Sequence, residues 1–144
     1  MAGVKRVARW ARLVLGVLFL VGIVVQFLAA GYGLFADPGN FDLHEGLGFT
    51  VMHWIPILIL IAGLLIWRPR PELLLSVAIG VLGFIQPILA GAGDWAGVFH
   101  PLNALVLFFL TYRLVDYDRR TLRRAELPAA GETRAEPGAQ VARP

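Results

Sequence analysis

The sequence predicts an all-α protein, an antiparallel four-helix transmembrane bundle built from two duplicated helical hairpins. Composition is the first observation: 58% of the 144 residues are hydrophobic and only 16% are charged, whereas a soluble domain carries about 25% charged residues. The second observation is that the charges are unevenly spread and leave four long apolar stretches. These stretches are continuous rather than alternating, which predicts helices and not the strands of a membrane barrel.

Four membrane spans are predicted in chain order, at about residues 13–35, 43–67, 73–93 and 98–115. The first three have the roughly 20 apolar residues that a bilayer-crossing helix needs. The fourth is shorter, and we expect it to cross because Arg113 can extend its charged group toward the membrane surface. A cleaved signal peptide is the alternative for the first span. Its apolar run exceeds the usual run of about 7–15 residues, which favours an uncleaved helix.

The connections between the spans carry turn and cap signals. Pro69 and Pro71 end the second span and allow the third to begin. The segment Asp37-Pro38-Gly39-Asn40 predicts a turn after the first span. Asp42 is expected to cap the second span, with Glu45 as its capping-box partner.

The positions of the cations predict the orientation in the membrane. Lys and Arg occur before the first span, between the second and third, and after the fourth, whereas the other two connections contain none. The positive-inside rule then places both termini in the cytoplasm. Residues 1–12 form a basic cytoplasmic N-terminus, residues 13–115 the transmembrane domain, and residues 116–144 a charged, partly disordered cytoplasmic tail. The pI near 10.0 fits attraction to anionic lipid head groups, so the lipid bilayer is the expected partner and nucleic acid is not.

The chain contains no cysteine. Electron transfer through disulfides, thiolate metal sites and thioether-attached haem are therefore excluded. Enzymatic activity stays open, and a role without catalysis is the more expected one.

The two halves of the chain resemble each other. Gln26-Phe27-Leu28-Ala29-Ala30-Gly31 near the end of the first span corresponds to Gln86-Pro87-Ile88-Leu89-Ala90-Gly91 near the end of the third. Each segment is followed by a loop and then by a histidine at the start of the next span, His44 or His100. This pattern predicts a duplicated helical hairpin in parallel repeat.

Polar side chains inside the spans mark the candidate site, because such groups are costly in a membrane and face the bundle interior. His44 and His100 lie at similar depth near the outer face on two parallel helices, so their imidazoles could supply both axial ligands of a non-covalent, b-type haem. Asn103 lies one turn from His100 and could orient it. Gln26 and Gln86 are expected to support the site or to hydrogen-bond between helices.

A flat macrocycle needs room between helices and donors for its propionates. Small residues could give the room, with close helix packing as the alternative; they are Gly22, Ala29, Gly33, Gly80 and Gly83. The outer connections contain no Lys or Arg, so the propionates would depend on helix N-termini and on neutral donors such as Asn40, Asn103 or Trp95.

His53 is expected to play a different part from His44. Nine residues at about 100° each place the two on nearly opposite faces of an ideal helix, with His53 about 13 Å deeper. We therefore expect a core histidine that pairs with Gln26 or Gln86.

Recurring motifs of the chain carry a resemblance to one family, and the repeat with its two histidines carries a more distant one to a second family. The motifs are Gln26…Ala30-Gly31…Phe35, His44-Glu45-Gly46-Leu47-Gly48, Gln86-Pro87 and His100-Pro101-Leu102-Asn103-Ala104-Leu105. Over residues 5–115 the chain resembles an uncharacterised family of small four-helix membrane proteins from high-GC bacteria, which implies the bacterial inner membrane. More distantly it resembles one four-helix half of haem A synthase, whose ligand histidines lie on the second and fourth helix of each half. Phe41 and Glu45 stand where the catalytic half of that family has a glutamate and an arginine, so oxygenation of a haem methyl group is not implied.

Three functions fit these features. The favoured one is a b-type haem protein, ligated by His44 and His100, that passes electrons to a membrane redox partner at the outer face. The second is a cofactor-free module that packs against other membrane proteins or against copies of itself. The third is a divalent metal site at the outer surface, built from the same two histidines with acids such as Glu45 or Asp94.

Overall fold

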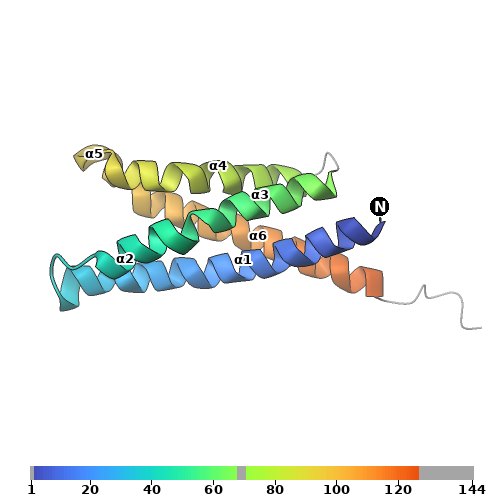
Figure 1. Ribbon diagram of the computed structural model, residues 1–144, viewed down its shortest axis with the longest axis horizontal. Helices are drawn as coiled ribbons and strands as arrows, with labels where there is room; N and C mark the ends of the chain where they lie inside the picture. The colour runs from blue at the N-terminus through green and yellow to red at the C-terminus, as the bar shows by residue number, and fades with distance from the viewer. Residues whose placement is uncertain (1, 68–70, 127–144) are drawn as a thin grey trace, which may run out of the picture.

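The computed structural model describes residues 2–67 and 71–126, and in this part of the chain every regular element is a helix. The first rod consists of α1 (Ala2–Gly31) and the π-helix η1 (Tyr32–Ala36). The second consists of α2 (Asp42–Leu47), the π-helix η2 (Gly48–Met52) and α3 (Trp54–Ile66). The third is α4 (Pro71–Gly91), and the fourth is α6 (Phe99–Glu126), preceded by the short α5 (Asp94–Gly97). The predicted all-α, four-helix fold is confirmed (Figure 1).

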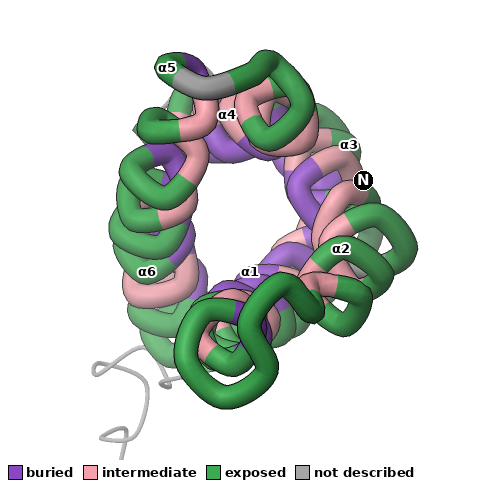
Figure 2. The backbone as a smooth tube through the Cα atoms, turned by 90° about the vertical axis from the view of Figure 1, so that its left-hand side faces the viewer, coloured by how far each residue is buried: buried purple, intermediate pink, exposed green. Residues whose placement is uncertain are grey.

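All four rods are long and apolar enough to cross a membrane, and the chain is a multi-pass membrane protein. They form a ring in which α1 and α4 each pack against both α3 and α6 (Figure 2). The pairs of rods with the fewest contacts are diagonal: α1 lies across the bundle from α4, and α3 lies across from α6. We call the end of the bundle with η1, α2 and α5 the histidine end, and the end where α1 begins and α6 finishes the terminal end (Figure 1).

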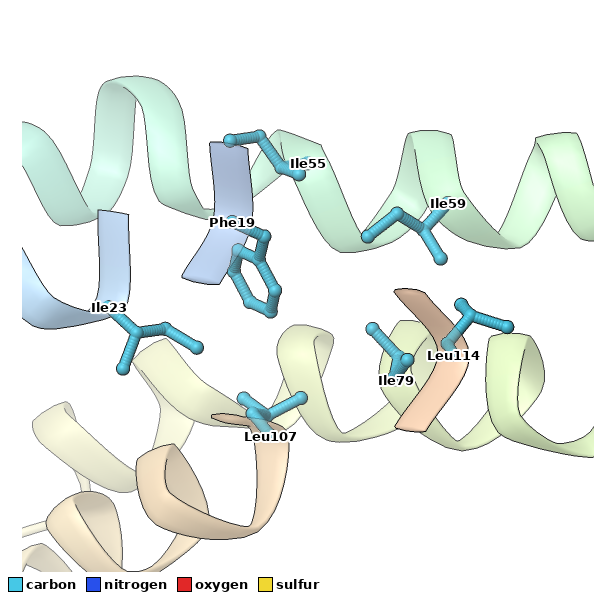
Figure 3. Close-up of a cluster of buried hydrophobic side chains, with 7 residues drawn as sticks. All are labelled: Phe19, Ile23, Ile55, Ile59, Ile79, Leu107 and Leu114. Carbon is cyan, nitrogen blue, oxygen red and sulfur yellow. The ribbon is translucent and has the colours of Figure 1, made fainter. Parts of the chain in front are cut away.

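The core is a cluster of buried apolar side chains contributed by all four rods (Figure 3). It consists of Phe19, Ile23, Ile55, Ile59, Ile79, Leu107 and Leu114. Large apolar side chains are also exposed along the outside of every rod. Since lipid tails are as apolar as the core, hydrophobicity alone cannot decide which face of a helix turns inward, and close packing and polar contacts carry that information.

A buried cluster of charged side chains joins three rods near the terminal end, and we call it the terminal ion cluster. The guanidinium of Arg12 donates to both carboxylate oxygens of Asp118, from Nε over 2.8 Å and from Nη2 over 2.6 Å, and its Nη1 donates to Ser76 Oγ over 3.1 Å. Arg9 bridges Asp118 Oδ1 at 3.0 Å and Glu72 Oε1 at 3.2 Å. Arg12, Asp118 and Glu72 are 1%, 0% and 2% exposed. Two arginines and two carboxylates thus balance each other's charge inside the bundle, linking α1, α4 and α6.

The expected capping box at the second rod is wrong. The residue that precedes α2 is Phe41, and no side chain caps the helix there. Glu45 N instead donates to the backbone carbonyl of Phe41 over 2.9 Å, and Asp42 N reaches the side-chain oxygen of Asn40 at 3.4 Å. The helix begins on Asp42 itself, so its carboxylate cannot reach back to the first amides from the preceding position.

Candidate functional site

A cavity of about 770 Å³ lies inside the histidine end of the bundle. Apolar side chains from all four rods form most of its wall, among them Phe19, Ile23 and Leu107 at its deep end. The four rods form a ring when the bundle is seen from the histidine end (Figure 2), and residues of each of them line the cavity. All three histidines and both glutamines of the candidate site line it; these are His44, His53, His100, Gln26 and Gln86.

The two repeats hold their histidines in the same way. His44 Nδ1 lies 3.1 Å from the backbone carbonyl oxygen of Gln26, and His100 Nδ1 lies 3.0 Å from that of Gln86. A carbonyl only accepts, so each Nδ1 carries the proton and donates it. In this tautomer the Nε2 of each ring keeps its lone pair, which is the atom that a neutral imidazole offers to a metal.

The rings of His44 and His100 come together across the bundle. Their centroids are 5.9 Å apart and their planes lie at 78° to each other. The two histidines come from the second and fourth rods, which are diagonal in the bundle and run in the same direction. Their side chains meet across its centre. Two imidazoles this close together could both bind one metal ion, since a metal–imidazole bond is about 2 Å long.

Asn103 acts on His100 through Gln86. Its Nδ2 donates to the side-chain oxygen of Gln86 and to the backbone carbonyl of Leu82. Gln86 Nε2 in turn donates to the backbone carbonyl of His100 over 3.1 Å and lies 3.5 Å from His100 Nε2. The second repeat therefore satisfies its own polar side chains, and Asn103 is a positioning residue rather than a direct neighbour of the imidazole nitrogen.

The first repeat lacks this internal network. Leu47 stands where the second repeat has Asn103, three residues after the histidine. Both side-chain atoms of Gln26, Nε2 and Oε1, are buried without a hydrogen-bond partner. The amide nitrogen lies beside Gly48, 3.4 Å from where a Cβ on that glycine would stand. The two repeats thus differ. In the second repeat the polar side chains hydrogen-bond to groups of the same repeat, whereas in the first the amide of Gln26 has no partner.

His53 lines the same cavity as His44, and the expectation of an opposite face is wrong. The reason is η2, where the amide of His53 donates to the carbonyl of Gly48, five residues back, over 3.0 Å. A π-turn takes up about one residue more than an α-turn, which rotates everything after it by about 100°. His53 Nδ1 is buried and has no partner, so the expected pairing with either glutamine is not formed. Its ring lies 5.6 Å from that of Trp54 and 6.1 Å from that of Phe84.

Four of the small residues expected to make room for a macrocycle are in close packing contacts. A Cβ on Gly83 would overlap Pro56, one on Gly80 would meet Leu60 at 2.9 Å, and one on Gly22 would overlap Met52. Gly33 is filled in the same way by the backbone of Asn40. Gly83 nevertheless lines the cavity, together with other small residues; these are Ala30, Gly31, Gly48, Ala90, Gly97 and Ala104.

Within residues 2–67 and 71–126, no group of three or more His, Cys, Asp or Glu side chains lies close enough to hold a metal ion. The side chain of Asp94, a possible third ligand, falls outside the described residues. So do Arg68, Arg70 and the tail segment from residue 127 that was expected to be disordered.

Residues 26–93 match the model of DUF6220, a family of unknown function. This fits the resemblance to an uncharacterised family. The match begins at Gln26, includes His44, His53 and Gln86, and ends before His100. No curated protein and no solved structure shows significant similarity to the chain.

Proposed function

We propose that this chain is a b-type haem protein of the bacterial inner membrane in which His44 and His100 hold the haem for electron transfer near the outer face. The observation that carries the proposal is the facing pair of imidazoles, with centroids 5.9 Å apart and each Nδ1 engaged by a glutamine carbonyl. His44 and His100 would hold the iron, and because each Nδ1 is engaged by a backbone carbonyl, the Nε2 atoms would be the ligands.

The walls of the cavity suit such a group. They are largely apolar, they come from all four rods, and the volume of about 770 Å³ lies within the range of cofactor sites, about 300–1,000 Å³. The bound haem would supply one-electron chemistry at its iron. The protein would supply the two ligands, their fixed orientation and a surface that keeps water from the macrocycle.

The carboxylates of the haem have few partners inside the cavity. Of the neutral donors suggested by the sequence, Asn40 already donates to Asp37, and Asn103 to Gln86 and Leu82. Trp95 is 77% exposed at the histidine end. The carboxylates of a bound haem would therefore depend on water and lipid head groups at this end rather than on Asn40 or Asn103.

The proposed orientation places both termini in the cytoplasm. The cations near the first and fourth rods gather toward the terminal end, from Lys5 to Arg12 and from Arg113 to Arg124. The connection between η1 and α2, at the histidine end, contains no Lys or Arg. The positive-inside rule assigns the terminal end to the cytoplasm and the histidine end to the outer face.

A reduced-minus-oxidised absorption spectrum of the purified, detergent-solubilised protein tests the haem. We expect a sharp α band that is lost in His44→Ala and in His100→Ala. His53→Leu is the matched control, because it removes a third imidazole from the same cavity without removing a ligand, and it should keep the band. A colourless parent protein, or an unchanged band in His100→Ala, would overturn the proposal.

A cofactor-free interaction module is the second candidate, and a groove on the outside of the bundle favours it. The groove lies between α1 and α3 toward the terminal end, has a volume of about 600 Å³ and is lined by small and apolar side chains. On α1 these include Gly3, Val4, Val7, Ala8 and Ala11. Small residues at such spacing let another membrane helix approach closely. Colourless protein that crosslinks to a partner or to itself from Val4 and Val7 would support this candidate.

Metal analysis of the same sample, with and without a chelator, tests the divalent metal site.

A further inference from the structure

A second set of polar atoms lines the cavity and takes no part in holding the two imidazoles. It consists of Nε2 and Oε1 of Gln26 and Nδ1 of His53, all buried and all without a hydrogen-bond partner. Native interiors leave few polar atoms in this state, because desolvation without a compensating hydrogen bond is costly. These atoms therefore indicate a ligand.

The free atoms lie deeper in the bundle than the His44 ring. The amide of Gln26 rests beside Gly48, one turn after His44, and His53 follows five residues later. They are thus separated by about one helical turn, roughly 5–7 Å along the bundle. The π-turn creates this arrangement, because an uninterrupted α-helix would direct His53 away from the cavity.

The lining defines the chemistry of the ligand. No Lys or Arg lines the cavity within the described residues, so a carboxylate or phosphate group would lack a counter-charge. Glu45 is the one acidic residue that lines the cavity among the described residues, and it would repel an anionic ligand. The rest of the wall is largely apolar and lies within the membrane-crossing rods, which selects a lipid-soluble, uncharged compound. Trp54 and Phe84 flank the His53 ring at 5.6 Å and 6.1 Å and are themselves exposed on the outside of the bundle. The aromatic side chains that do line the cavity, among them Phe27, Phe41 and Phe49, favour a flat head group.

We propose that this deep part of the cavity binds the head group of a lipid-soluble quinone or hydroquinone. One ring oxygen bonds to the amide of Gln26, which can donate or accept, and the other to Nδ1 of His53, which can do either according to its tautomer. The two oxygens of a para-quinone stand at opposite ends of the ring, a spacing of the same order as one helical turn. The site lies in the same cavity as the proposed iron site but uses other polar atoms, and it does not depend on haem binding.

Quenching of Trp54 fluorescence by a short-tailed benzoquinone tests the site. The other three tryptophans, Trp10, Trp67 and Trp95, are exposed and are replaced by Phe, which leaves Trp54 as the reporter beside His53. Titration of this protein in lipid nanodiscs should give saturable quenching. Gln26→Leu and His53→Leu should each raise the apparent Kd by about threefold to tenfold, as expected for one hydrogen bond to a neutral group.

Phe109→Leu is the matched control, because Phe109 occupies in the second repeat the position of His53 in the first and is exposed to lipid. It should leave the Kd unchanged, and His53→Asn, which keeps a polar atom near the place of Nδ1, should recover part of the affinity. Each variant is first shown to elute as the parent does. The titration is repeated with His100→Ala, so that a failure of haem binding leaves the quinone result intact. Quenching that rises linearly without saturation, or to the same extent in Gln26→Leu and His53→Leu as in the parent, would overturn the proposal.

Discussion

Asp118 accepts three hydrogen bonds from two arginines in the terminal ion cluster, and its side chain is fully buried. Substitution by Ala would leave Arg9 and Arg12 with only Glu72 to balance them, so one positive charge inside the bundle would lose its partner. Removal of one partner from a buried ion pair costs about 3–5 kcal/mol, because the charge that remains has been taken out of water without compensation. We expect Asp118→Ala to lower the free energy of unfolding by an amount in this range.

Unfolding of the purified protein in mixed micelles, followed by the helical circular dichroism signal as denaturing detergent is added, measures this change. Asp116→Ala is the matched control, since Asp116 forms an exposed ion pair with Arg120 on the same helix at 2.9 Å. Exposed pairs of this kind contribute about 0–1 kcal/mol. A double variant, Arg12→Met with Asp118→Leu, removes both charges at once and should be more stable than Asp118→Ala. If Asp118→Ala destabilised the protein no more than Asp116→Ala, the cluster would not hold the terminal end together as inferred.

Three further changes test the packing and the site. Gly83→Val would drive a branched side chain into Pro56, and it should lower the free energy of unfolding by about 1–3 kcal/mol in the same assay. Thr111 Oγ1 is buried without a partner, so Thr111→Val should leave the stability unchanged or raise it, and a clear loss would reveal a missing partner. Asn103→Leu should free the Gln86 side chain and weaken haem retention on a size-exclusion column, and equal retention by parent and variant would count against its positioning role.

The fold and the histidine pair could be predicted from the sequence because both depend on long-range regularities. Uninterrupted apolar runs predict helices in lipid. The repeat of a glutamine segment followed by a histidine predicts that His44 and His100 meet, and their rings do meet. Neither inference depends on the exact number of residues per helical turn.

The role of His53 could not be predicted, because it depends on one backbone hydrogen bond that spans five residues instead of four. The shift from an i→i+4 to an i→i+5 bond at Gly48 turns His53 into the cavity, and the sequence contains no strong signal for it. The close packing of the small residues could not be predicted for another reason. Apolar surroundings on both sides of a membrane helix leave open whether a glycine faces a ligand, a neighbouring helix or lipid.

The terminal ion cluster did leave a signal in the sequence. Leu107, Thr111, Leu114, Asp118 and Leu122 recur every three to four residues, and all five are buried on one face of α6. A carboxylate on an inward face, with arginines spaced three residues apart on another helix, indicates an internal ion pair. The positive-inside pattern hid it, because the same arginines also serve as markers of orientation.

The terminal ion cluster fixes α1, α4 and α6 to one another at one end of the bundle, whereas the histidine end has no such ionic contact among the described residues. The Cα atoms of Asp118 and Phe99 are separated by 19 residues of α6, which corresponds to a lever of about 29 Å. A tilt of about 5° around this cluster would move the far tip of α6 by roughly 2.5 Å. Such a tilt would change the spacing between the helices at the histidine end while the contacts of the terminal ion cluster stay in place.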